Sequence, residues 1–412
     1  MNTSKISYIK NTYYLVNILY SLSISIFGAT IYLYMESINY NNTQINLFLA
    51  VFWLVSFLTE IPSGIIADSF GRKNTLIASC LIRGIGLLLL YIDWGNILLL
   101  VTGAVLTAIG ESLKSGTVDS WMVDSIKEID NNYEFEKVFS VGSVYGTFFS
   151  LISGFIGGQL IGPIDLGYPI LLGSIILFIT IIVVIIMMKE TRPKGVHNQF
   201  SVRYSLGTLK NTTKFGIQYL KEDKAFLLIC LSFLPLALIV TGPGNQWQLL
   251  FHVEGESIGV GYIWVLMSLC GMLGAYLSKK ISGLSNNKIS ILMISTLVNT
   301  SAIIICVLSN NYLLSLVFFL FHVIVTASEE IIRYTFLHQN IATENRATVL
   351  SFFNTLEAGV TSLALLIIGG LSDVIGIGNT WLVMAVLSIV ISLPLFIVVN
   401  KVLLKIKREQ RI

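Results

Sequence analysis

Several carboxylate side chains lie within long apolar runs of this sequence, where an ionised group is costly. A charged side chain at the centre of a bilayer costs about 2.5 to 3.5 kcal/mol on insertion scales, so such residues are rare unless they have a task. In a poorly solvated cavity a carboxyl group can take up and release protons near neutral pH. The sequence therefore predicts proton-coupling acids, chiefly Glu329, Glu330 and Glu111, and also Glu60 and Glu357.

Basic side chains and further acids accompany these carboxylates and define a candidate charge network of Arg83, Lys114, Asp119, Asp124 and Arg333. Three pairs are spaced for an ion pair within one helix: Glu111 with Lys114, Glu330 with Arg333, and Glu329 with Arg333. Such pairing would lower the insertion cost without any role in proton transfer, and it is the structural alternative to proton coupling. Two of the acids, Glu60 and Glu357, have no basic partner nearby in the sequence.

Motifs typical of enzymes are missing from the sequence. It contains no HExxH helix, no GxSxG turn and no phosphate-binding loop. The histidines lack the spacing of metal ligands: His197, His252, His322 and His338. We therefore expect neither an enzyme nor an ATP-driven pump, and no metal, cofactor or nucleic acid.

Aromatic and amide side chains at two places could bind a flat amphiphilic molecule. The candidates are Asn17 and Tyr20 in the first apolar run, and Gln246 and Trp247 after a Gly-Pro-Gly sequence at 242–244. This Gly-Pro-Gly sequence is predicted to break a helix and free backbone groups, which is tolerated within a membrane only beside protein or a cavity. Trp247 could instead be an anchor at the outer membrane interface.

The elements that must position these residues are membrane-spanning helices. The chain has 412 residues, of which 54% are hydrophobic and 12% charged, against about 25% charged in soluble domains. A spanning helix needs about 20 mainly apolar residues. Suitable runs cover 13–34, 45–66, 75–92, 97–121, 137–160, 167–188, 226–243, 258–278, 289–309, 312–337, 347–371 and 380–400. The predicted fold is an all-α membrane protein with about twelve transmembrane helices.

Basic residues mark the predicted inner side of the membrane. Successive loops alternate between those that carry Lys and Arg and those that carry none, and the latter hold acids such as Glu36, Asp93 and Asp165. Because basic residues are retained on the cytoplasmic side, both termini are predicted to be cytoplasmic. No cleavable signal peptide is visible before the first run. We expect a multi-pass protein of the cell membrane, and the Asn- and Ile-rich composition hints at a bacterium.

The longest polar stretch divides the chain into two halves. Residues 1–188 and 226–412 each hold six of the predicted spans, and 189–225 is predicted to be a cytoplasmic linker. Residues 201–220 mix apolar side chains with lysines, which suits a helix on the inner leaflet, and a solvated connector fits equally well. Two six-helix halves around a midplane site are a recurrent plan of secondary transporters.

The most specific local pattern runs from Glu60 to Lys73, in the predicted inner loop after the second span. It reads Glu-Ile-Pro-Ser-Gly-Ile-Ile-Ala-Asp-Ser-Phe-Gly-Arg-Lys. Asp68 can pair with Arg72 or cap a helix, and Gly71 permits a tight turn. Arg72 and Lys73 could instead act only as topological anchors. The pattern resembles the loop signature of the major facilitator superfamily, and the resemblance implies that this loop is a latch between conformations.

Two further resemblances concern the kind of transporter. Residues 115–121, Ser-Gly-Thr-Val-Asp-Ser-Trp, are similar to the end of the fourth span in drug-efflux members from Gram-positive bacteria. Glycines of the fifth span resemble a worn version of the antiporter motif, without its Gly-Pro element, and they also suit close helix packing: Gly146, Gly154, Gly157 and Gly158.

The family resemblance implies two pseudo-symmetric six-helix bundles and transport by alternating access. It implies a monomer whose partners are a small-molecule substrate, protons and membrane lipids. We expect export of an antibiotic-like compound, with tetracycline as the first candidate, in exchange for protons. The alternatives are export or uptake of a metabolite, siderophore or peptide, and, more remotely, a non-transporting membrane receptor.

Overall fold

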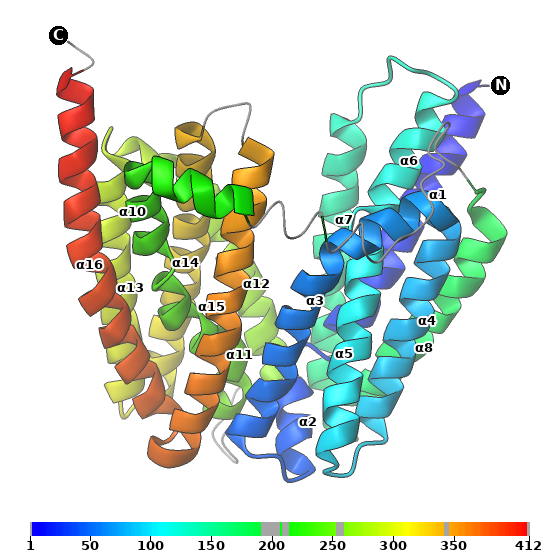
Figure 1. The fold of residues 1–412 in the computed structure, drawn as a ribbon. Helices are drawn as coiled ribbons and strands as arrows, with labels where there is room; N and C mark the ends of the chain where they lie inside the picture. Colours follow the sequence, from blue (N-terminus) through cyan, green and yellow to red (C-terminus); the bar gives the residue numbers. More distant parts are fainter. Residues whose placement is uncertain (1, 191–206, 208–213, 253–258, 342–345, 410–412) are drawn as a thin grey trace. The chain divides into compact units, whose positions relative to one another are not determined.

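The computed structural model describes residues 2–190, 207, 214–252, 259–341 and 346–409, which form helices joined by short turns (Figure 1). No strand occurs in these residues, so the predicted all-α class is confirmed. Contacts divide the chain into two compact units. Unit 1 contains Met1–Tyr40, Val51–Leu209 and Gly259–Val265, and unit 2 contains Asn41–Ala50, Lys210–Ile258 and Leu266–Ile412.

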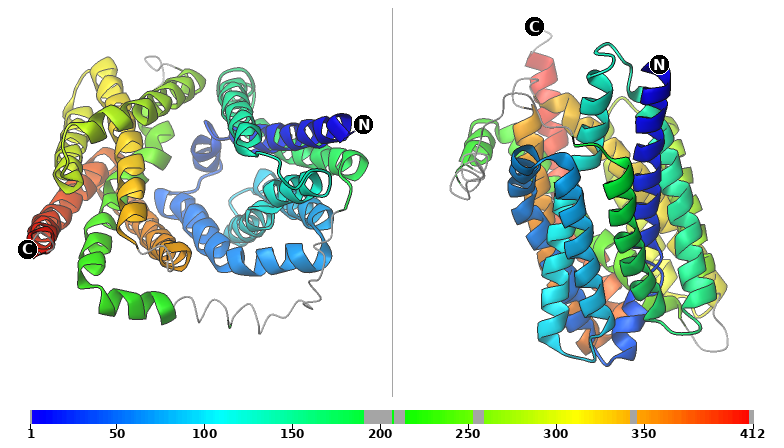
Figure 2. Two further views of the ribbon diagram at one scale, coloured as in Figure 1. Left: turned by 90° about the horizontal axis from the view of Figure 1, so that it is seen from above. Right: turned by 90° about the vertical axis from the view of Figure 1, so that its right-hand side faces the viewer.

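The first half of the chain folds into a bundle of long helices. They are α1 (Asn2–Ser25), α2 (Ile31–Ser37), α3 (Asn42–Phe70), α4 (Arg72–Tyr91), α5 (Ile97–Lys114), α6 (Thr117–Lys127), α7 (Glu136–Phe155) and α8 (Tyr168–Met187). A π-helical turn, η1 (Ile156–Ile161), continues α7. Within this bundle α4 packs against α5 and α8, and α1 packs against α7 and α8 (Figure 2).

The second half forms a bundle of its own. Its helices are α10 (Lys224–Phe233), α11 (Leu236–Phe251), α12 (Val260–Gly283), α13 (Lys288–Leu308), α14 (Tyr312–Asn340), α15 (Arg346–Ile375) and α16 (Ile377–Glu409). Here α13 packs against α14 and α16, and α11 packs against α15 and α16. Residues 214–222 of the predicted linker are helical, whereas residues 191–206 and 208–213 lie outside the described part of the chain.

Both the interior and the exterior of these bundles are apolar, as a lipid environment requires. Phe233, Phe336 and Phe396 are buried together in unit 2, and the ring centroid of Phe233 lies 6.1 Å from that of Phe336 and 6.0 Å from that of Phe396. Large apolar side chains such as Ile186 also remain on the outside, where this residue is 73% exposed. An apolar surface of this kind is favourable in contact with lipid hydrocarbon chains and unfavourable in contact with water.

Eleven helices of the described residues are long and apolar enough to cross a membrane. Each of these eleven helices corresponds to one of the twelve predicted spans. The predicted span without such a helix is 13–34. There the helix stops at Ser25 and resumes at Ile31. The number of spans that cross the membrane, and the side on which the termini lie, remain predictions.

The break between α1 and α2 lies directly against η1. The carbonyl oxygen of Ile26 occupies the place that a side chain on Gly157 would need, and Ala29 is similarly close to Gly158. Glycine is therefore required at these positions by the close approach of the two backbones. The close packing predicted from the glycines of the fifth span is thus present in unit 1.

Two predicted helices differ from expectation. The span predicted at 97–121 is divided, because Gly116 adopts a left-handed conformation with φ +66° between α5 and α6. The predicted break at 242–244 is wrong, since α11 continues through Pro243. Gly242 instead allows the Trp381 ring to approach, and the interruption falls at Pro235, whose missing amide hydrogen cannot continue the helix.

Candidate functional site

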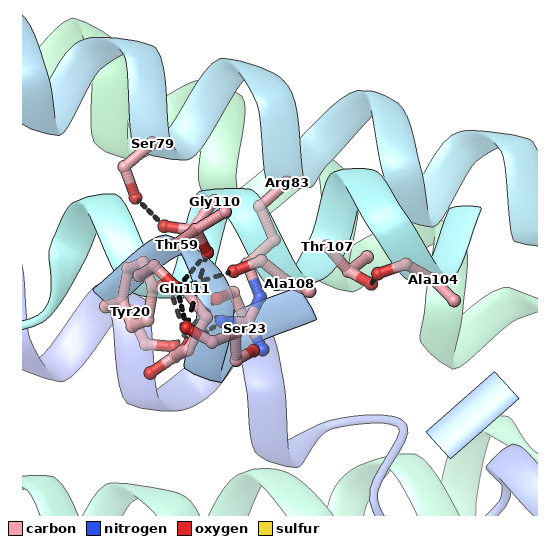
Figure 3. Close-up of polar contacts among 12 residues, drawn as sticks. Tyr20, Ser23, Thr59, Ser79, Arg83, Ala104, Thr107, Ala108, Gly110 and Glu111 are labelled. Carbon is pink, nitrogen blue, oxygen red and sulfur yellow. Dashed lines mark hydrogen bonds and ion pairs between the residues drawn. The ribbon is translucent and has the colours of Figure 1, made fainter. Parts of the chain in front are cut away.

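A buried polar network joins three helices of unit 1 (Figure 3). Arg83 of α4, only 5% exposed, forms an ion pair with Glu111 of α5. Its Nη1 also donates a hydrogen bond to the hydroxyl of Tyr20 in α1 at 2.9 Å. That hydroxyl donates in turn to Glu111 Oε2 at 3.1 Å. The carboxylate of Glu111 therefore accepts from two groups that lie far from it in the sequence.

Small residues hold α4 and α5 close enough for this network to form. The Ser79 hydroxyl donates to the Gly110 carbonyl oxygen at 2.6 Å, and a side chain at Gly110 would collide with the Arg83 backbone and Cβ. On the other face of α5, the Thr59 hydroxyl of α3 donates to that of Ser112 at 2.7 Å. The network therefore sits at a closely packed helix crossing in which hydroxyl groups satisfy backbone carbonyls.

The ion pair predicted between Glu111 and Lys114 is not present among the described residues, because Arg83 takes the carboxylate of Glu111. The Lys114 ammonium lies 5.0 Å from the ring centroid of Tyr20 instead. Helical spacing made the local pair possible, but the Arg83 guanidinium reaches the Glu111 carboxylate from the neighbouring helix.

Two other predicted acids of unit 1 are hydrogen-bonded by neutral hydroxyl groups. Asp119, an exposed residue of α6, accepts from the Tyr13 hydroxyl at 2.8 Å. Glu60 of α3 accepts from the Ser115 hydroxyl at 2.9 Å and is also exposed. Neither carboxylate is in an ion pair among the described residues.

In unit 2 the arginine of α14 pairs across to the next helix. Arg333 Nη1 lies 2.8 Å from Glu357 Oε1 of α15. The predicted pairs of Arg333 with Glu329 and with Glu330 are therefore wrong for the described residues, and Glu357 has a basic partner that sequence spacing did not reveal.

The two adjacent glutamates of α14 have contrasting surroundings. Glu329 is buried, with 6% exposure, and its Oε2 has no hydrogen-bond donor among the described residues. Glu330 is exposed and borders a groove of about 680 Å³, which is also lined by Ile331, Tyr334, Thr335, His338 and Gln339. A carboxyl group enclosed in this way is costly when ionised, because burial removes it from solvent and no ion pair among the described residues compensates its charge.

The loop motif of unit 1 is organised around one guanidinium. Arg72 Nη2 lies 3.0 Å from Asp68 Oδ1 and 3.6 Å from Asp124 Oδ2, so it bridges the end of α3 to α6. Gly71 between α3 and α4 has φ +93°, a conformation that other residues rarely adopt. The Lys73 ammonium donates to the Ile185 carbonyl oxygen at 2.7 Å, which ties the loop to α8.

Sequence reasoning missed Glu190 as a neighbour of this loop. Its carboxylate occupies the space beside Gly71 and accepts a hydrogen bond from the Lys73 amide at 3.4 Å, at the first turn of α4. A carboxylate is stabilised there by the free amides and dipole of a helix start. Nothing in the spacing of residues pointed to this contact, because 117 positions separate the two partners.

The four predicted substrate-binding residues lie in different surroundings. Asn17 is half-buried and donates to the Tyr13 carbonyl oxygen at 3.1 Å, and Tyr20 belongs to the buried network. Gln246 is fully buried in unit 2, where its side chain bonds to Ser372 and Trp381 at 3.1 Å each. Trp247 is 2% exposed.

Comparison with known proteins assigns a family to this architecture. The sequence description of the Major Facilitator Superfamily matches residues 13–365. The chain belongs to the Major Facilitator Superfamily. A relative in Bacillus subtilis (strain 168), named uncharacterized MFS-type transporter YxaM, is 24% identical over 257 residues. The match spans 62% of the length of this curated relative and 62% of the chain.

Solved structures of transporters share the superfamily fold of this chain. The nucleoside transporter NupG has a TM-score of 0.76 at 14% identity, covering 95% of this chain and 99% of that one. A bacterial homologue of the human lysosomal transporter Spinster has a TM-score of 0.72 at 15% identity, covering 97% and 98%. A POT family transporter in complex with 5-aminolevulinic acid has a TM-score of 0.70 at 14% identity, covering 95% and 96%.

Membership of the superfamily supports the class of protein that the sequence predicted, a transporter. The chain is a multi-pass membrane transporter and not an enzyme. The clusters around Arg83 and Arg333 are therefore candidate sites of a transporter.

Proposed function

We propose that this superfamily member is a proton-coupled secondary transporter that exports a small amphiphilic organic compound by alternating access. In this proposal about twelve spans cross the plasma membrane of a bacterium, with both termini in the cytoplasm and the protein acting as a monomer. The substrate is antibiotic-like, and tetracycline is the first compound to test.

The observation that carries the proposal is the burial of the Glu329 carboxyl group without a hydrogen-bond donor for Oε2 among the described residues. This carboxyl group is enclosed in a membrane-spanning helix, and Oε2 meets no donor within the described residues. Arg333, one turn along the same helix, is in an ion pair with Glu357. Taking up a proton removes the cost of an enclosed negative charge, and access to water on one side of the membrane releases the proton again. A proton therefore shifts the balance between two conformations that expose Glu329 differently.

The energy available from such coupling is sufficient for export. One proton that moves down a membrane potential of about 100 mV and a gradient of about one pH unit supplies about 2.3 plus 1.4 kcal/mol. Export is supported by the similarity of residues 115–121 to drug-efflux members, and the groove beside Glu330 offers aromatic rings to a flat compound.

The test uses purified protein reconstituted in liposomes with an imposed pH gradient. We expect tetracycline to move against the direction of proton movement and to cease moving when an ionophore removes the gradient. Glu329→Gln, which keeps the shape and removes the titratable group, is expected to abolish gradient-driven transport while exchange of labelled for unlabelled tetracycline continues. Glu36→Gln, at an exposed position in a predicted outer loop, is the matched control. Gradient-driven transport by Glu329→Gln at the rate of the parent protein would refute this role.

The same assay addresses the alternative substrates. Transport of a nucleoside or peptide in place of tetracycline, still driven by protons, would replace the substrate and keep the coupling mechanism. Co-movement of protons and substrate in one direction would show an importer.

A further inference from the structure

Two cations flank one aromatic ring in unit 1. The Arg83 guanidinium carbon lies 5.4 Å from the ring centroid of Tyr20, and Lys114 Nζ lies 5.0 Å from it. A single carboxylate, that of Glu111, is bound within this group, and it is paired with Arg83. The three charged side chains Arg83, Lys114 and Glu111 therefore carry one net positive charge, and Asp119 attracts the Lys114 ammonium from beyond ion-pair distance.

The excess charge belongs to Lys114. Within the described part of the chain, no carboxylate oxygen lies within the 4.0 Å of Lys114 Nζ that would make an ion pair. Asp119, the next acid along the chain, accepts a hydrogen bond from the Tyr13 hydroxyl, and Glu60 accepts one from the hydroxyl of Ser115, the residue beside Lys114. Arg83 is also incompletely satisfied, since its buried Nε has no acceptor among the described residues.

Lys114 lies beside an open turn at the end of α5. It is the last residue of α5, half-buried, and the exposed residues Ser115 and Gly116 follow it. No atom lies within 4 Å of the position that a side chain on Gly116 would occupy, so open space adjoins the turn. Contact with a ring face leaves the ammonium hydrogens that point away from the ring able to donate to a ligand.

An ammonium group outside any ion pair is costly in a membrane-spanning helix. A ligand that carries a negative charge would remove that cost on binding, while the buried ring of Tyr20 stays in contact with the ammonium. We propose that Lys114, held over the ring of Tyr20, binds a carboxylate or equivalent anionic group of the transported compound. This rests on the proposed transport function and assigns the substrate to acidic or zwitterionic amphiphiles.

The first test compares two probes with the same ring system, the anionic 1-naphthoate and the neutral 1-naphthylmethanol. With the full chain in detergent, we expect 1-naphthoate to bind at least about tenfold more tightly, as one charge-assisted hydrogen bond would provide. Lys114→Met should reduce this ratio to about one, and Lys114→Arg should keep most of it. Lys127→Met, at an exposed lysine near the end of α6, should leave the ratio unchanged.

A second measurement on the unmodified protein guards against a variant that fails to fold. Acetylation of Lys114 by an amine-reactive ester, followed by mass spectrometry, should slow in the presence of 1-naphthoate and not of 1-naphthylmethanol. Acetylation of Lys127 should be equal in both. Equal effects of the two probes at Lys114, or no effect of either, would overturn the proposal.

The outcomes separate this inference from the proposed function. If Lys114 serves only to balance Asp119, Lys114→Met will lower the melting temperature and leave the probe ratio unchanged, which also overturns the proposal. Because binding in detergent requires no proton gradient, loss of gradient-driven transport in Glu329→Gln tests the coupling mechanism alone. A preference for 1-naphthoate without proton-driven transport would retain the anion site and reject proton coupling.

Discussion

Arg333 of α14 forms its ion pair with Glu357 of α15, 24 positions away, although two glutamates on its own helix are spaced to reach it. The N–O distance is 2.8 Å, and the two side chains are 13% and 26% exposed. The pair therefore fastens α14 to α15 within unit 2 and leaves Glu329 without this cation as a direct partner.

Removal of the Glu357 charge is expected to destabilise unit 2. Glu357→Gln leaves the half-buried guanidinium of Arg333 without a carboxylate, and such a group costs about 1 to 3 kcal/mol. A lower melting temperature in detergent would measure the effect. The exchange variant Arg333→Glu with Glu357→Arg restores an ion pair and should recover part of the loss. Equal melting temperatures for Glu357→Gln and the parent protein would show that the pair contributes nothing.

Glu111→Gln should be more damaging than Glu357→Gln. Arg83 is 5% exposed, so loss of its partner leaves an almost fully buried charge, at a cost of about 3 to 5 kcal/mol. The double variant Arg83→Met with Glu111→Leu removes both charges and should be more stable than Glu111→Gln alone. Chemical denaturation in mixed micelles can rank the three proteins, and a double variant no more stable than Glu111→Gln would contradict the argument.

Gly71→Ala should be costly for two separable reasons. The positive φ alone costs a side chain about 1 to 3 kcal/mol, and an alanine Cβ would also displace the carboxylate of Glu190. Gly95, with φ +88° and only a backbone oxygen at 3.4 Å, is the matched control for the first reason. Gly71→Ala should therefore lower the melting temperature more than Gly95→Ala. Adding Glu190→Ala should bring the Gly71→Ala protein close to the level of Gly95→Ala.

Asp68→Asn is expected to reduce transport more than Asp124→Asn. The Asp68 carboxylate lies closer to Arg72, at 3.0 Å against 3.6 Å for Asp124. If this loop is the latch that the family resemblance implies, loss of a charge-assisted hydrogen bond would change the conformational equilibrium by about tenfold or more. Initial rates in everted vesicles, normalised to protein in the membrane, make the comparison. Glu128→Gln, at an exposed position beyond α6, should behave as the parent protein.

The sequence alone determined the class of protein and the approximate positions of its long helices, whereas the breaks at residues 26–30 and at Gly116 came from the structure. Apolar runs of spanning length need no tertiary information, because every backbone group in a lipid environment must be bonded within its own helix. The motif around Asp68 and Arg72 was equally readable, since its residues are neighbours along the chain and pair at a spacing of four.

Only the tertiary structure decided which charges meet. Arg83 with Glu111, Arg333 with Glu357, and Glu190 with the loop at Gly71 all join different helices or a helix and a loop. Spacing within one helix predicted other partners for Glu111 and Arg333, because it cannot register a guanidinium that reaches across a helix crossing. Tertiary packing also accounts for Gly242, which leaves room for the ring of Trp381 within a helix that continues unbroken. Local sequence sets which backbone forms a helix, whereas the partner of a buried charge depends on which helices pack together.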